Sequence, residues 1–203
     1  MRNLTTLGRL IIFSVYLISA NAADALKPDS QGYVRNWLML APITFPEGRG
    51  GTDLIYQDQI SHEAALKPAA GEKTTVNRKE LTWTPITAST NYFDFNQILK
   101  SANDRAMGFM VTYIECDQEL PGVIMALGSN DEGRLYLNGV DIYVFAEPRT
   151  LEPDVDKGRV TLKKGVNVVV FKIFNDQGNW QGSMRFLDKS GVPLTNLKIK
   201  LAP

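Results

Sequence analysis

Short apolar segments separated by glycine- and asparagine-rich turns follow one another from residue 109 to residue 201. Apolar and polar residues alternate within 134–137 and 197–201, a pattern typical of strands with one face in solvent. Asn138-Gly139 follows the first of these segments, and both residues tolerate the positive φ of a two-residue type I′ turn. The pattern predicts a β-hairpin over 134–145 and an all-β fold for this part of the chain.

The segment 166–174 carries valine, phenylalanine and isoleucine on both parities. A strand buried on both faces has this composition, so we expect a central strand here. The other predicted strands are 34–40, 109–116, 160–162 and 180–187. Two short helices are also predicted, over 53–66 and 94–100, the first ending ahead of Pro68.

The N-terminal residues form a predicted signal peptide, residues 1–22. Two arginines precede and flank the apolar run Leu10–Ile18, and Ala20-Asn21-Ala22 supplies a cleavage site. The run is too short to cross a bilayer, which needs about 20 residues. We therefore expect an exported chain, periplasmic or extracellular, with no integral membrane segment after cleavage and one β-sandwich domain over 23–203.

Composition and charge exclude several other classes of protein. The residues are 44% hydrophobic, which suffices for one sizeable core. Cys116 is the only cysteine, so no internal disulfide forms, and its apolar surroundings predict a buried thiol. The whole chain has 22 basic and 22 acidic residues, and the basic ones are scattered. Nucleic-acid binding draws on clustered lysine and arginine, so we expect no nucleic-acid partner.

Several weak motifs recur in an order and spacing typical of one superfamily. They are Trp37-Leu38-Met39-Leu40-Ala41-Pro42, Trp83, Asp94-Phe95, Gly128-Ser129-Asn130-Asp131, Leu135-Tyr136-Leu137-Asn138-Gly139, Leu162-Lys163-Lys164-Gly165-Val166-Asn167 and Gly178-Asn179-Trp180. Together they resemble the galactose-binding-like jelly-roll domains, such as the sugar-binding domains of glycoside hydrolase family two and related secreted bacterial modules. The resemblance implies a jelly-roll β-sandwich with one or two short helices. Many such domains bind glycans, whereas others brace a neighbouring catalytic domain.

The chain departs from this family at two places. Ala41-Pro42-Ile43 stands where relatives commonly have Gly-Pro-Phe, and Ser129-Asn130-Asp131-Glu132 stands where they have a Ser-Asp-Asp loop. The second departure leaves fewer carboxylates to offer a cation or a sugar hydroxyl.

A sugar site pairs an exposed aromatic ring with side chains that make directional hydrogen bonds. We expect such a site in the end loops of the sandwich, with Trp180 as the ring; the alternative is that Trp180 packs in the core, as we expect for Trp37 and Trp83. The predicted ligand-binding residues are Trp180, Asn179, Asn175, Asp131, Tyr143 and Arg149.

Catalytic chemistry has little support in the sequence. His62 is the only histidine, and the chain after residue 22 has no Gly-x-Ser-x-Gly elbow, so we interpret His62 as a surface or capping residue. A structural calcium ion is possible at 130–132 or at Asp154 and Asp156, while no other cofactor is expected. Carboxylate pairs such as Asp131 and Glu132 leave a small glycoside hydrolase as the least favoured option.

The sequence thus predicts a secreted, non-catalytic module that binds carbohydrate through the end loops of a jelly roll. The alternative is a structural or assembly protein that braces an envelope or extracellular protein partner without touching sugar.

Overall fold

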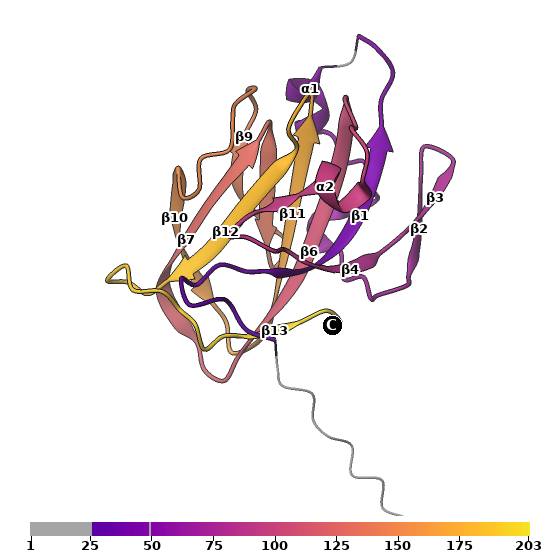
Figure 1. The fold of residues 1–203 in the computed structure, drawn as a ribbon. Helices are drawn as coiled ribbons and strands as arrows, with labels where there is room; N and C mark the ends of the chain where they lie inside the picture. Colours follow the sequence, from indigo (N-terminus) through magenta and orange to yellow (C-terminus); the bar gives the residue numbers. More distant parts are fainter. Residues whose placement is uncertain (1–25, 49) are drawn as a thin grey trace, which may run out of the picture.

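Two antiparallel β-sheets pack face to face in the computed structural model, which describes residues 26–48 and 50–203 (Figure 1). The predicted signal peptide lies outside the described residues. The larger sheet runs in the order β4 (Thr84–Thr87), β1 (Asn36–Thr44), β6 (Ala106–Cys116), β11 (Gly165–Asn175), β8 (Gly133–Leu137) and β9 (Val140–Phe145), and β13 (Lys198–Lys200) also pairs with β6. The smaller sheet runs in the order β10 (Asp156–Leu162), β7 (Leu120–Asn130), β12 (Gln181–Leu187) and β5 (Phe93–Asp94). The predicted all-β sandwich with short helices is confirmed.

The first core lies between the two sheets. Trp37, Phe171 and Phe186 belong to it, and each is completely buried. Because this core is made of large apolar and aromatic side chains, it supplies the main hydrophobic stabilisation of a chain that has no disulfide.

A second core covers the opposite face of the larger sheet. Its outer layer consists of α1 (Gly51–Tyr56), a 3-10 turn at Glu63–Ala65 and the hairpin of β2 (Lys73–Val76) and β3 (Lys79–Thr82). Both faces of β11 are therefore buried: Phe171 points to the first core and Phe174 to the second. This explains the apolar residues on both parities, and the predicted central strand is confirmed, since β11 lies between β6 and β8.

The predicted hairpin is also confirmed. β8 and β9 pair with Leu137 opposite Val140, and Asn138 and Gly139 between them have φ angles of 53° and 81°. Both angles lie in the left-handed region that a type I′ turn requires.

One of the two predicted helices is wrong in extent. A helix over 53–66 was expected, but α1 ends at Tyr56 and the chain turns before the 3-10 turn at Glu63. The turn carries the completely buried Glu63 to Lys172 of β11, and a continuous helix would not allow this contact. The second helix is confirmed as α2 (Phe95–Leu99), where Asp94 caps the first turn by accepting a hydrogen bond from the Gln97 amide at 3.0 Å.

Three predictions about buried side chains are confirmed. Trp37 and Trp83 are core residues, and Cys116 is 5% exposed. Burial raises the pKa of the Cys116 thiol, and the nearby Asp117 charge adds to the effect, so this thiol is poorly suited to act as a nucleophile. Among the described residues, no helix has the length and hydropathy needed to span a bilayer.

Candidate functional site

Three loops meet at one end of the sandwich and line an open cavity of about 450 Å³. They are the turn between β7 and β8, the connection between β9 and β10, and the loop between β11 and β12. In Figure 1 this end lies at the top, around the tip of the β11 arrow. The lining residues are Asn130 and Asp131 from the first loop, Pro148, Arg149 and Thr150 from the second, and Asp176, Gln177 and Asn179 from the third.

Asp131 ties the three loops together. One carboxylate oxygen accepts a hydrogen bond from the Arg149 amide at 3.3 Å, and the other accepts one from the Asp176 amide at 3.0 Å. Burial raises the pKa of this carboxyl, although the two amide hydrogen bonds oppose the shift. Asp131 therefore lines the cavity and also holds the second and third loops in place around it.

Arg149 holds the second loop against the sandwich. Its Nη2 donates to Asp156 at 2.7 Å and to the Tyr143 hydroxyl at 2.5 Å, and its Nε donates to the Ser129 carbonyl at 3.1 Å. The guanidinium also stacks 3.8 Å from the centre of the Phe145 ring. These contacts use Nε and Nη2 and hold Arg149 in the wall of the cavity, while Nη1 makes no hydrogen bond within residues 26–48 and 50–203 and keeps its two N–H donors.

The loop between β11 and β12 is anchored at Gly178. The Asn96 amide donates to the Gly178 carbonyl at 2.7 Å, and the Gly178 amide donates to the Asp104 carboxylate at 3.2 Å. These contacts anchor the loop backbone, from which the exposed Gln177 and Asn179 side chains extend, so little backbone ordering is needed when a ligand binds.

The cavity offers polar groups that make no hydrogen bond to other side chains or to backbone within the described part of the chain. Asp176 supplies a half-buried carboxylate, Gln177 and Asn179 supply exposed amides, and Thr150 supplies an exposed hydroxyl. A carboxylate only accepts hydrogen bonds, while amides and hydroxyls both donate and accept. This set suits a ligand that is itself rich in hydroxyl groups.

The prediction that Trp180 is an exposed platform is wrong. Its ring is completely buried, stacks on Phe95 with 4.1 Å between ring centres, and donates to the Ile173 carbonyl at 3.2 Å. Asn175 is likewise completely buried, and its amide donates to the Asn103 carbonyl at 2.7 Å. A side chain just before a strand at the rim of a sandwich can point into the core or toward solvent. Here Trp180, the residue before β12, points into the core.

The other predicted residues are divided between the cavity and its supports. Asp131, Arg149 and Asn179 line the cavity, whereas the Tyr143 hydroxyl lies behind it, donating to Asp156 at 2.7 Å. Five further lining residues were not among the predicted ligand-binding residues: Asn130, Pro148, Thr150, Asp176 and Gln177. Nothing in the sequence distinguishes them from ordinary turn residues, because only the fold brings the second loop beside the other two.

The acidic pairs considered for catalysis or calcium do not act together in the structure. Asp131 faces the cavity, but Glu132 points to the other side of the chain, where its carboxylate lies against Gly51 of α1. Asp154 is paired with Arg185, and Asp156 with Arg149.

No metal cluster is found in the part of the chain that the structure describes, and the single histidine lies at the surface. Within residues 26–48 and 50–203, no group of three or more histidine, cysteine or acidic side chains is arranged to hold a metal ion. His62 is an exposed residue at the start of the 3-10 turn, as predicted.

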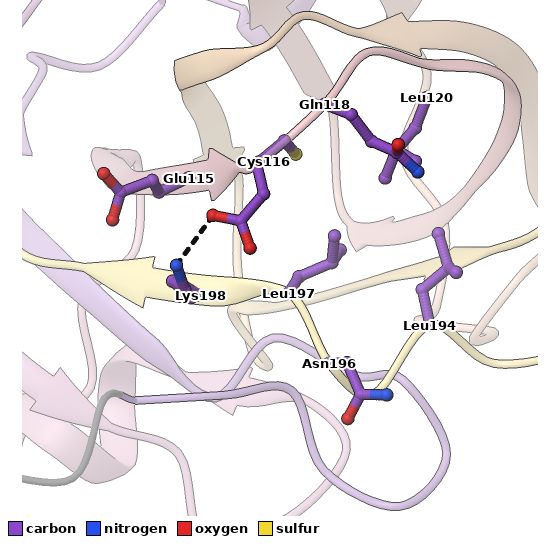
Figure 2. A pocket seen from close by; sticks show the side chains of 9 residues that line it. Glu115, Cys116, Gln118, Leu120, Leu194, Asn196, Leu197 and Lys198 are labelled. Atoms are coloured by element: carbon purple, nitrogen blue, oxygen red, sulfur yellow. Dashed lines mark hydrogen bonds and ion pairs between the residues drawn. The ribbon is translucent and has the colours of Figure 1, made fainter.

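A second cavity, of about 160 Å³, lies at the opposite end of β7 (Figure 2). Leu120, Leu194 and Leu197 line it together with Cys116, and a 2.8 Å ion pair between Asp117 and Lys198 closes one side. Two charged side chains at its rim are thus already paired with each other. This cavity therefore offers a hydroxyl-rich ligand fewer free polar groups than the loop cavity does.

No protein-family model and no curated protein matches the sequence. Two solved structures align with most of the chain. One is described as the PA14 sugar-binding domain from an RTX adhesin, with 12% identity over 81% of this chain and 96% of that one and a TM-score of 0.43. The other is the PA14 domain of the MpAFP antifreeze protein, with 11% identity over 90% and 98% and a TM-score of 0.42. The resemblance to the sugar-binding domains of glycoside hydrolase family two stays a prediction.

Proposed function

We propose that this chain is an exported, non-catalytic, single-domain module that binds carbohydrate in the cavity formed by its three end loops. The observation that carries the proposal is a set of polar side chains that converge there, those of Thr150, Asp176, Gln177 and Asn179, none of which is hydrogen-bonded to another residue within 26–48 and 50–203. The cavity volume of about 450 Å³ lies within the range of small-molecule sites, roughly 300 to 1,000 Å³.

Sugar hydroxyls donate and accept hydrogen bonds at once, so a sugar site needs both kinds of partner in fixed positions. The Asp176 carboxylate accepts, and the amides of Gln177 and Asn179 do both. Because Asp131 and Gly178 are already held by hydrogen bonds, the loop backbones that carry these groups are preorganised.

The proposal is tested by titrating the purified protein with a glycan array and then, by calorimetry, with the soluble glycans that respond. Asp176→Asn removes the charged acceptor, and we expect it to weaken binding by about tenfold or more, since a hydrogen bond to a charged group contributes roughly 1.5 to 3 kcal/mol. Glu119→Gln, which removes an exposed charge at the opposite end of β7, is the matched control and should bind as the unmodified protein does. No response to any glycan would reject the proposal.

The titration is run both in calcium chloride and in a chelator, because calcium prefers carboxylate and amide oxygens of the kind found here. Binding in both solutions would assign the contacts to protein side chains alone. Binding in calcium chloride only would indicate that a calcium ion takes part in sugar binding in the same cavity.

A second candidate function, the brace, is favoured by the exposed edge of the sandwich. β9 and β10 end the two sheets, and a groove of about 330 Å³ runs between them. Val144 of β9 is 39% exposed, and an unpaired strand edge is a template for pairing with another chain. This function predicts co-purification with one extracellular protein and loss of that protein from a Val144→Lys variant.

A further inference from the structure

Tyr56, the last residue of α1, is the most exposed aromatic side chain of the described residues. It is 55% exposed, and no other aromatic residue within 26–48 or 50–203 exposes more than about a third of its surface. The aromatic ring that a sugar site needs, which the sequence suggested at Trp180, is therefore present at a different position.

Arg134 fixes the end of α1 that carries this ring. Its Nη1 donates to the carbonyls of Ile55 and Tyr56 at 3.3 and 3.1 Å, and its guanidinium carbon lies 5.8 Å from the centre of the Tyr56 ring. Its remaining donors, Nε and Nη2, bind one oxygen of Asp141 at 2.9 and 2.6 Å. The ring is thus held in place by a side chain that is itself fixed, which lowers the entropy lost when a ligand stacks on it.

Asp141 binds the same Arg134 side chain and adds a hydrogen-bond acceptor to this cluster. Arg134 binds only its Oδ2, and Oδ1 accepts no hydrogen bond within the described part of the chain. The side chain is 40% exposed, so this oxygen is accessible from solvent. An exposed aromatic ring and a free carboxylate oxygen, both in contact with Arg134, offer partners for the apolar C–H face and the hydroxyl edge of a pyranose ring.

The same connection that lines the loop cavity also contacts α1. The Thr52 hydroxyl of α1 donates to the Ala146 carbonyl at 2.8 Å, and the chain continues from Ala146 to Pro148, Arg149 and Thr150 of the cavity. Arg134 in turn follows Asp131 by three residues. The 146–150 segment therefore contacts α1 at Ala146 and lines the cavity at 148–150, and α1 lies at the loop end of the sandwich in Figure 1.

From this placement we infer that Tyr56 and Asp141 form a second sugar subsite, so that the ligand of this protein is an oligosaccharide that reaches from the loop cavity across residues 146–149 to the Tyr56 ring. The inference rests on the proposed function, because the cavity holds the first sugar unit. Once one sugar unit of an oligosaccharide is bound in the cavity, a second unit of the same molecule is held close to the Tyr56 subsite. The affinity should therefore rise with the length of the oligosaccharide.

The test is calorimetric titration with monosaccharides and with soluble oligosaccharides of increasing length built from the same sugar, chosen from the array. Tyr56→Ala should weaken binding of the long oligosaccharides by about 3- to 10-fold, the usual size of an aromatic stacking contribution, and leave monosaccharide binding unchanged. Tyr56→Phe keeps the ring and should bind as the unmodified protein does. Since Tyr56 is exposed, both variants should keep the unmodified thermal unfolding temperature.

The outcomes separate the inference from the function beneath it. If Tyr56→Ala binds every length of ligand as tightly as the unmodified protein, or if affinity does not increase with ligand length, the second subsite is rejected. The proposal that sugar binds in the loop cavity is unaffected by either result. If no sugar of any length binds, or if Asp176→Asn is without effect, the proposed function fails as well.

Discussion

Individual polar residues near the loop end have different roles according to which side of the backbone they face. Asp131 and Glu132 are neighbours in the sequence, yet one shapes the cavity and the other is buried under α1. Glu132 is 2% exposed, and its Oε2 has no hydrogen-bond partner in the described part of the chain. A buried carboxyl of this kind strongly disfavours its charged form.

The pH dependence of stability should reveal Glu132. Burial raises its pKa from 4.5 to about 7, and the charges of Asp131 and Asp176 add to the shift. Between these values the folded chain binds a proton that the unfolded chain has lost, so the free energy of unfolding decreases as the pH rises from about 4.5 to about 7. The loss should approach about 3 kcal/mol, since each pKa unit corresponds to about 1.4 kcal/mol.

Urea unfolding at a series of pH values measures this loss. Glu132→Gln cannot ionise and should flatten the curve across that window. A curve of equal slope in the variant would show that Glu132 is not the group responsible.

At the same scale, the sequence could predict which residue types a sugar site would use but not which way each would point. Asp131, Arg149 and Asn179 do line the cavity. Trp180 does not, because the side that faces the core at a strand start depends on the register of β12 against β5 and β7, and no local pattern fixes that register.

Among the elements, the outer layer is held to the larger sheet by a buried ionic contact. Lys172 and Glu63 are both completely buried and paired, and Glu63 also accepts a hydrogen bond from the Tyr136 hydroxyl at 2.8 Å. Burial lowers the pKa of Lys172, while the Glu63 charge opposes the shift. Each partner is stable in the core only because the other is present.

Removing one partner of this pair should therefore cost more than removing both. We expect Glu63→Leu and Lys172→Met each to destabilise the protein by roughly 3 to 5 kcal/mol, because each leaves an uncompensated buried charge. The double variant should be more stable than either single one. Urea unfolding of the four proteins gives the coupling free energy, and strictly additive losses would contradict a paired contact.

Close packing of β6 against α2 and β12 gives a second prediction for the elements. A Cβ at Gly108 would lie 2.3 Å from the Phe95 ring and 2.9 Å from the Trp180 ring, which are the stacked pair beneath the β11–β12 loop. Gly108→Ala should destabilise the protein by about 1 to 3 kcal/mol through overpacking. Gly158→Ala in β10 is the matched control, since its Cβ would meet nothing within 4 Å, and its effect should be close to zero. Equal unfolding midpoints for the two variants would contradict this packing.

The sequence predicts a helix or turn correctly where interactions between residues close in the sequence determine it. The 138–139 turn and the short helix over 94–100 were predicted correctly, and both depend on interactions between residues close in the sequence. The central position of β11 followed from its apolar composition. The helix over 53–66 was wrong because a contact between Glu63 and Lys172, 109 residues apart, overrides the local periodicity.

Over the whole molecule, the candidate site and the described chain ends lie at opposite ends of the sandwich. Leu26 pairs with Ile199 of β13, and β13 and the C-terminus lie at the bottom of Figure 1, while the three loops and α1 lie at the top. The loop end is thus unobstructed by the described chain ends, and both the cavity and Tyr56 face solvent there.

The central claim, that the three end loops bind carbohydrate, is tested most directly by mapping amide NMR shifts during titration with a glycan that responds on the array. The account predicts shifts concentrated at 130–131, 148–150 and 176–179, and in Asp176→Asn the same shifts only at about tenfold or more higher glycan concentration. Shifts confined to β9 and β10, or to the cavity beside Cys116, would contradict it.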